Sequence, residues 1–240
     1  MTLLAITGLT KRFGGLLVFD QLSFSLGRGE RLGVVGPNGA GKSTLFNLIS
    51  GVVAPNSGSI SFDGSDLKRS DAWTRCHLGI GRTFQIPKPF GDMTVFENLM
   101  VAATYGRGLS MRAARAHCDD VIAQTRLSAK AARPAGSLML ADLKRLELAR
   151  ALALKPKLLL LDEIAGGLTT AECDELLSIL DSIQDQAISV IWIEHVVAAL
   201  TRYVTRILVL AQGRAIADGS PSSVFADPKV RTLYLGEDDA

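Results

Sequence analysis

A glycine-rich loop near the N-terminus has the residue types that bind phosphate groups. It fits the pattern G-x-x-x-x-G-K-[ST] and consists of Gly36, Pro37, Asn38, Gly39, Ala40, Gly41, Lys42, Ser43 and Thr44. An apolar run at 31–35 precedes it and a helical pattern at 45–49 follows it. In such loops backbone N–H groups surround phosphate oxygens, the lysine reaches the β- and γ-phosphates, and the first hydroxyl, here Ser43, binds Mg²⁺. The loop therefore predicts a site for a nucleoside triphosphate and Mg²⁺.

Two acidic residues follow a run of four leucines later in the chain. The leucines occupy 158–161, and Asp162 and Glu163 come next. A continuous apolar strand of this kind belongs in a parallel sheet that is covered on both faces. At the end of such a strand Asp162 can bind the magnesium ion, and Glu163 can polarise an attacking water. With the phosphate loop, this pair favours hydrolysis of the nucleotide over its storage.

The remaining patterns predict the elements that position these residues. Apolar or alternating runs at 3–7, 22–26, 59–62 and 189–193 indicate strands, and 206–211 with 214–217 indicates a hairpin. Apolar spacing predicts an amphipathic helix from 111 to 125, capped by Ser110, and a second helix from 143 to 154. The chain thus reads as an α/β protein with a mostly helical segment from about 90 to 150.

Length and composition limit the class of protein. The 240 residues, 48% hydrophobic and 21% charged, are typical of one large globular domain. The formal charge of +2 gives no reason to expect nucleic acid as a partner. Three cysteines without a C-x-x-C pair argue against disulfides or structural zinc. The N-terminus lacks a secretory signal, and no apolar run approaches the ~20 residues of a membrane span, so a membrane role would come through a partner.

The combined motifs resemble the ATPase subunits of ATP-binding cassette transporters, from Leu3 to about Glu237. Phe13 stands where that family has an aromatic ring that stacks on adenine, and His195 stands at its switch histidine, which contacts the γ-phosphate. Gln85 stands at its glutamine loop, which senses the γ-phosphate or Mg²⁺ and transmits closure. The resemblance implies ATP and Mg²⁺ as ligands, with Ser43, Gln85 and Asp162 at the metal. It also implies a P-loop NTPase core (1–89 and 151–240) with an antiparallel β subdomain and a helical subdomain at about 90–150, in one domain over 1–240.

One motif departs from the family pattern. The place of the L-S-G-G-Q signature is held by Leu138, Met139, Leu140, Ala141 and Asp142. In the family, the signature of one subunit binds the γ-phosphate of the ATP that is held by the other subunit. Met139 cannot donate the serine hydrogen bond, the side chains at 140 and 141 limit close approach, and Asp142 adds negative charge.

The segment after the carboxylate pair is altered as well. Gly166-Gly167-Leu168-Thr169 stands in place of S-A-L-D, and Ile164 in place of a common proline. We therefore expect a weakened signature and a dimer with a second, different ATPase subunit. A homodimer, with two weak sites, is the alternative.

Further segments resemble the ATPase subunits of branched-chain amino acid uptake systems. They lie at 79–85, 90–99, 217–221 and 230–237. The resemblance implies two transmembrane permease subunits, an extracytoplasmic substrate-binding protein and a peripheral position on the cytoplasmic face of the membrane. The apolar face of 90–135, with Phe90 and Phe96, is a candidate groove for a permease helix. Amides, urea and aromatic acids stay open beside leucine-like substrates.

Other classes explain fewer of these motifs. A soluble cassette ATPase for DNA repair or ribosome work would need a coiled-coil insertion or two cassettes, a GTPase would need N-K-x-D, and a small-molecule kinase leaves Gln85 and His195 unexplained. A non-hydrolytic regulatory subunit is the stronger rival because the signature is degenerate. Core or surface packing, rather than metal binding, is expected for His77, His117, Cys118, Trp73 and Trp192.

Overall fold

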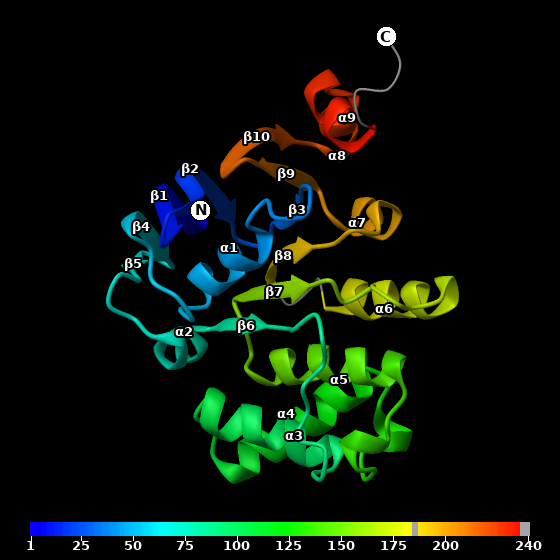
Figure 1. Cartoon of the computed structure of the whole chain (residues 1–240). Helices are drawn as coiled ribbons and strands as arrows, with labels where there is room; N and C mark the ends of the chain where they lie inside the picture. Colours follow the sequence, from blue (N-terminus) through cyan, green and yellow to red (C-terminus); the bar gives the residue numbers. More distant parts are fainter. Residues whose placement is uncertain (184–186, 236–240) are drawn as a thin grey trace. The chain divides into compact units, whose positions relative to one another are not determined.

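The computed structural model describes residues 1–183 and 187–235, and it divides into two compact units. Unit 1 comprises Met1–Asp71 and Ser189–Ala240, and unit 2 comprises Ala72–Ile188. In Figure 1 unit 1 takes the blue and the orange-to-red parts of the chain, and unit 2 takes the green and yellow parts. Gly236 and Glu237, at the end of the subfamily match, lie outside the described residues. The core and insert boundaries at about 90 and 150 stay a prediction.

An antiparallel sheet of four strands, in the order β2-β1-β4-β5, belongs to unit 1. Its strands are β1 (Thr2–Phe13), β2 (Leu16–Gly27), β4 (Ser57–Phe62) and β5 (Ser65–Asp66). Ile6 of β1 lies opposite Phe24 of β2 and Ile60 of β4, and all three side chains are buried. Since successive side chains of a strand point to opposite faces, this row forms the apolar side of the sheet. The predicted strands at 3–7, 22–26 and 59–62 lie within longer observed ones.

Parallel strands form the second part of unit 1. The strand β3 (Arg31–Val35) runs parallel to β8 (Ser189–Ile193) and to β9 (Arg206–Ala211), and β10 (Arg214–Gly219) is antiparallel to β9. Every residue of β8 is buried, as expected for a parallel strand covered on both faces. The helices of this unit are α1 (Lys42–Ile49), α7 (Val197–Tyr203), α8 (Pro221–Ala226) and α9 (Pro228–Leu235). The predicted bounds of β3 and β8 are confirmed.

Unit 2 combines a short parallel strand pair with helices. The pair is β6 (Ile80–Arg82) and β7 (Leu158–Asp162), and all of β7 is buried. The α-helices are α2 (Ala72–Leu78), α3 (Val95–Val101), α4 (Met111–Gln124), α5 (Leu140–Ala153) and α6 (Thr170–Ser182). A π-helical turn, Ala102–Gly106, follows α3, and 3-10 turns lie at Ser128–Lys130 and Ala135–Ser137. No helix in the described parts of the chain is long and apolar enough to span a membrane.

The helix expected at 111–125 is confirmed, and the helix expected at 143–154 begins earlier. Ser110 caps α4, since its hydroxyl accepts a hydrogen bond from the N–H of Ala113. The helix α5 begins at Leu140, three residues before the predicted start. The apolar spacing did not reveal this first turn, because Leu140 is 44% exposed and does not belong to the buried face.

Candidate functional site

The phosphate loop, residues 36–44, connects β3 to α1 in unit 1. Gly36 and Gly41 have φ of 155° and 93°. A Cβ at Gly36 would lie 2.1 Å from the carbonyl oxygen of Leu210, and one at Gly41 would lie 2.8 Å from the Phe19 ring. Both positions therefore require glycine. Gly41 is the N-cap of α1 and provides no side-chain cap, so N–H groups of the first helical turn are available to an anion.

Lys42 brings a positive charge to this loop. Its side chain is buried, and its ammonium donates hydrogen bonds to the carbonyl oxygens of Gly36 at 2.7 Å and Pro37 at 3.0 Å. Ser43, the next residue, is exposed on the first turn of α1. The loop thus joins a lysine, a hydroxyl and a helix N-terminus, which is the donor set that phosphate groups require.

Phe13 and His195 are also in unit 1. Phe13 is the last residue of β1 and pairs with Leu16, the first residue of β2. Its ring is 47% exposed, and the ammonium of Lys11 lies 4.6 Å from the ring centre. An exposed ring of this kind can stack on a base. His195 follows β8 and is exposed, and its backbone N–H donates to a carboxylate oxygen of Glu194 at 3.1 Å.

Glu194 is a residue whose role the sequence did not reveal. It is buried, and its second oxygen accepts a hydrogen bond from Trp192 Nε1 at 3.1 Å. Trp192 is fully buried and packs edge-on against Tyr203, so it is a core residue, as predicted. Glu194 therefore anchors the turn that carries His195 to the core of unit 1.

Asp162 lies at the carboxyl end of β7 in unit 2. The Arg82 guanidinium contacts the Asp162 carboxylate at 3.0 Å, and the backbone N–H of Asp162 donates to the Thr83 hydroxyl at 3.0 Å. Burial raises the pKa of Asp162, and the hydrogen bond and charge of Arg82 oppose that shift. Arg82 thus partly compensates the cost of ionising this buried carboxylate.

Glu163 and Gln85 meet in the same unit. Gln85 Nε2 donates to Glu163 Oε2 at 2.5 Å. Glu163 has a φ of 48°, the left-handed region that a non-glycine residue rarely adopts. Buried Lys144 of α5 donates to the backbone oxygens of Gln85 at 2.8 Å and Glu163 at 2.9 Å. Lys144 belongs to none of the sequence motifs, so its role could not be predicted from them.

The signature segment, residues 138–142, leads into α5. Leu138 is buried, whereas Met139 is 77% exposed and is an N-cap residue without a side-chain cap. Asp142 was expected to place a negative charge beside phosphate, but its carboxylate is buried and forms ion pairs with Lys130 and, at 2.7 Å, with Arg145. Two cations of unit 2 therefore neutralise it, which corrects that expectation.

The altered segment after Glu163 is built into unit 2. Ile164 is fully buried, and Gly167 has a φ of 78°. Thr169 caps α6 in a capping box: its hydroxyl accepts from the N–H of Glu172 at 3.3 Å, and the Glu172 carboxylate accepts from the N–H of Thr169 at 2.8 Å. The carboxylate also accepts a hydrogen bond from the Thr169 hydroxyl at 2.8 Å, and the two bonds that it accepts from Thr169 lower the pKa of Glu172.

The predicted site residues thus fall into two groups. Phe13, residues 36–44 and His195 belong to unit 1, whereas Gln85, the 162–163 pair and the signature segment belong to unit 2. Within unit 2 the structure brings Gln85 to Glu163 through a direct hydrogen bond. Each group alone holds only part of the predicted chemistry.

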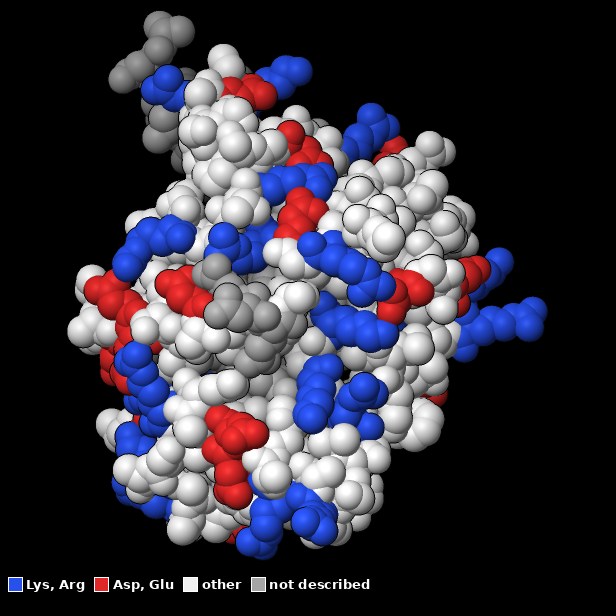
Figure 2. All heavy atoms as spheres, turned by 180° about the vertical axis from the view of Figure 1, so that it is seen from behind, with Lys and Arg blue, Asp and Glu red and all other residues white. Residues whose placement is uncertain are grey.

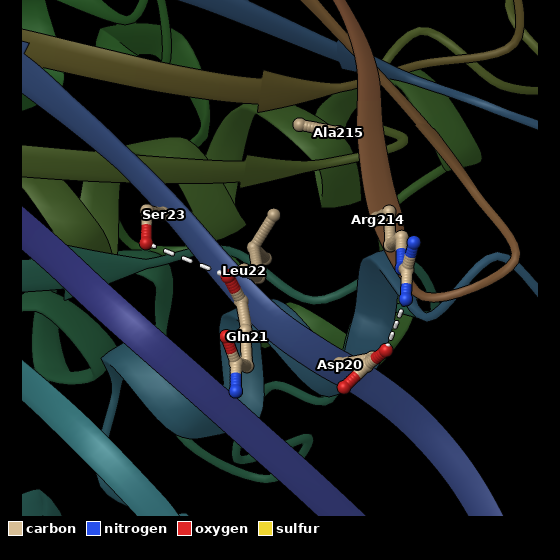
Figure 3. Close-up of a pocket in the computed structure, with 6 residues that line it drawn as sticks. All are labelled: Asp20, Gln21, Leu22, Ser23, Arg214 and Ala215. Carbon is tan, nitrogen blue, oxygen red and sulfur yellow. Dashed lines mark hydrogen bonds and ion pairs between the residues drawn. The ribbon is translucent and has the colours of Figure 1, made fainter.

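Each unit contains cavities among its described residues. One of about 530 Å³ opens between β2 and β10, where Arg214 forms an ion pair with Asp20 at 2.6 Å (Figure 3). A groove of about 310 Å³ in unit 2 is lined by Met93, Glu97, Met100, Val101, Thr104, Tyr105 and Met111. Phe96 lines a neighbouring cavity of about 540 Å³, while Phe90 lies under the guanidinium of Arg150. A groove thus lies within the 90–135 segment, but neither Phe90 nor Phe96 lines it, and its role as a contact for a permease helix stays a prediction.

Surface charge is mixed. On the face in Figure 2, Lys and Arg side chains intermingle with Asp and Glu among the described residues. This distribution follows from the nearly equal counts of 26 basic and 24 acidic residues.

The loop between a parallel strand and a helix, with a carboxylate pair at the end of another strand, defines a phosphate-loop nucleoside triphosphatase. The family model described as ABC transporter matches residues 19–166, and one described as branched-chain amino acid ATP-binding cassette transporter matches residues 216–240. The chain belongs to the ABC transporter family and is an ATPase that binds ATP.

Relatives match over nearly their whole length. The high-affinity branched-chain amino acid transport ATP-binding proteins BraF of Pseudomonas aeruginosa and LivG of Salmonella typhimurium are 34% and 36% identical, with 98% of each chain covered. The lipopolysaccharide export system ATP-binding protein LptB of Haemophilus influenzae is 31% identical over 99% of this chain and 98% of its own. A crystal structure of a nucleotide-free cassette from an ABC transporter superposes with a TM-score of 0.90 at 28% identity, covering 99% and 100% of the two chains.

Proposed function

We propose that this ATPase powers the import of branched-chain or related amino acids. The observation that carries this proposal is the match of residues 216–240 to the branched-chain amino acid family, together with the full-length similarity to BraF and LivG. Amides, urea and aromatic acids are the alternative substrates. The similarity to LptB is the reason to test the direction and cargo of transport directly.

At the nucleotide, we assign roles from the chemistry of each side chain. Lys42 and the backbone N–H groups of the phosphate loop bind the β- and γ-phosphates, and Phe13 stacks on adenine. Glu163 accepts the proton of the attacking water, while His195 and Gln85 orient the γ-phosphate and that water. The exposed positions of Phe13 and His195 support these roles because both side chains can reach a ligand.

The proposed metal is Mg²⁺, and the donor set fits it. Ser43, Gln85 and Asp162 offer a hydroxyl, an amide and a carboxylate oxygen, which are the hard ligands that Mg²⁺ prefers. The raised pKa of Asp162 fits as well, since a nearby cation would offset the cost of ionising a buried carboxylate. When bound, the ion would supply positive charge that neutralises the terminal phosphates.

The proposed partners are two transmembrane permease subunits, an extracytoplasmic substrate-binding protein and a second ATPase subunit, with no nucleic acid. This arrangement would place the chain on the cytoplasmic face of the membrane. The groove lined by Met93, Met100 and Met111 is our candidate contact for a permease helix, because it is apolar and methionine-rich.

We further propose that the second ATPase differs from this chain. Exposed Met139 supplies no hydroxyl, and α5 begins at Leu140, whose side chain stands where the family pattern has a glycine. In a heterodimer, the partner's signature would serve the ATP bound by this chain's phosphate loop.

Affinity purification from solubilised membranes of the native host, with mass spectrometry, tests this assembly. Recovery of two permeases and a different ATPase supports it, whereas recovery of a soluble partner contradicts it. ATP hydrolysis by the pure chain at about 1 s⁻¹ or faster would contradict the need for a different ATPase.

Uptake of labelled leucine, amide, urea and aromatic acid by cells with and without the gene identifies the substrate. Glu163→Gln distinguishes a subunit whose ATP hydrolysis drives transport from a regulatory subunit. We expect this substitution to abolish transport, and unchanged transport would make the chain regulatory.

A further inference from the structure

Three segments of unit 2 that are distant in sequence meet at one ammonium group. Lys144, on the second turn of α5, donates to the backbone oxygen of Gln85 at 2.8 Å and to that of Glu163 at 2.9 Å. The side chains of those two residues bond each other at 2.5 Å. Lys144 therefore closes a ring of hydrogen bonds that fixes both the backbone and the side chains of the pair.

The burial of Lys144 makes this arrangement specific. A lysine is rarely buried unless its charge is compensated, and this one is 4% exposed. The two carbonyl oxygens accept hydrogen bonds, and the charge of Lys144 also acts on nearby Asp162, whose ionised form it favours. The charge of Lys144 thus acts at the carboxyl end of β7, where Arg82 forms an ion pair with Asp162.

The backbone of Glu163 explains why such support is needed. Its φ of 48° is one that side-chain-bearing residues rarely adopt, so the surrounding contacts must hold it. The Glu163 carbonyl also accepts a hydrogen bond from the N–H of Gly166, at a longer distance of 3.3 Å. Lys144 supplies the shorter and charge-assisted contact.

We propose that Lys144 is a positioning residue for hydrolysis: it holds Gln85 and Glu163 in register and links them to the helix that carries the signature segment. One residue, Leu143, separates Lys144 from this segment, which ends at Asp142. Displacement of α5 would therefore move the ammonium that donates to the backbone oxygens of Gln85 and Glu163. The Glu163 carboxylate, which activates water, would move with that backbone. This inference rests on the proposed roles of Glu163 and Gln85.

The test compares Lys144→Met and Lys144→Arg in the purified transporter complex. Methionine keeps the length of the side chain and removes its hydrogen bonds, whereas arginine keeps the charge and donors. We expect Lys144→Met to lower kcat for ATP hydrolysis by at least about tenfold, since small displacements of a catalytic group cost up to about 100-fold. The KM for ATP should change by less than about threefold, and Lys144→Arg should recover most of kcat.

Controls separate positioning from folding and from the proposed function. Lys68→Met removes an exposed lysine of unit 1 and should leave kcat unchanged. ATP binding and the thermal midpoint of each variant show whether it is folded. A fall of kcat and ATP binding together, without rescue by arginine, would overturn the inference in favour of a structural role.

Glu163→Gln tests the proposed function separately from the positioning role of Lys144. If Glu163→Gln abolishes hydrolysis and Lys144→Met leaves kcat intact, the positioning role is refuted while the proposed function stands. If Glu163→Gln itself leaves hydrolysis intact, the proposed function fails first.

Discussion

Replacement of Asp142 by asparagine should destabilise the chain, although the position belongs to a segment with a proposed functional role. The Asp142 side chain is 6% exposed and lies against Lys130 and Arg145. Loss of one member of a buried ion pair typically costs about 3–5 kcal/mol, because the remaining charge is left without compensation.

Two features of this cluster lower that figure. The Lys130 side chain is 32% exposed and can turn to water, and Arg145 keeps its contact with Glu175 at 3.0 Å. We therefore expect Asp142→Asn to reduce the free energy of unfolding by about 2–3 kcal/mol, between a buried pair and an exposed one.

Urea denaturation followed by circular dichroism measures this change through the shift of the midpoint at constant slope. Asp120→Asn is the matched control, an exposed helical aspartate that should change stability by less than about 0.5 kcal/mol. The loss at Asp142 should persist at about 0.5 M salt, since buried pairs are weakly screened. A loss as small as that of the control would refute the assignment of a buried, neutralising cluster.

Three further predictions concern other parts of the chain. Burial raises the pKa of Cys118 to about 11, so this thiol should resist a thiol reagent at about pH 8 and react only after unfolding; rapid labelling in the folded chain would contradict its burial. Hydrogen bonds from Thr169 lower the pKa of Glu172 below 4.5, so their stabilisation is complete above that pH and is lost as the pH falls through the folded-state pKa. Thr169→Ala should therefore destabilise more at about pH 6 than at about pH 3, and an equal loss at both would exclude this linkage. Gly36→Ala should abolish ATP binding measured by calorimetry, because its Cβ would lie 2.1 Å from the Leu210 oxygen, and unchanged affinity would show that the loop has room.

Local patterns predicted the parts of the fold that depend on neighbours in sequence. The bounds of β3 and β8, the phosphate loop between β3 and α1, and the cap of α4 by Ser110 all follow from residue order. Strand ends were less predictable, because β1 and β2 extend through polar residues that pair across the hairpin.

The contacts around the candidate site could not be predicted in this way. Lys144 reaches Gln85 and Glu163, which are 59 and 19 residues away in sequence. Asp142 could be recognised as an unusual signature residue, but its neutralisation depends on how Lys130 folds back to it. Tertiary approach of side chains decides both, and no motif records it.

The neutralised state of Asp142 also constrains how this chain can evolve. A single substitution of glutamine at 142 would remove the acid that Lys130 and Arg145 share, and it would leave Met139 unchanged. Such a first step towards the family's phosphate-binding signature would therefore cost stability before it supplies the serine hydroxyl. A change at Lys130 made first would leave Asp142 paired with Arg145 alone, so that the later change at 142 would remove one ion pair instead of two. The order of substitutions would thus decide how much stability each step costs.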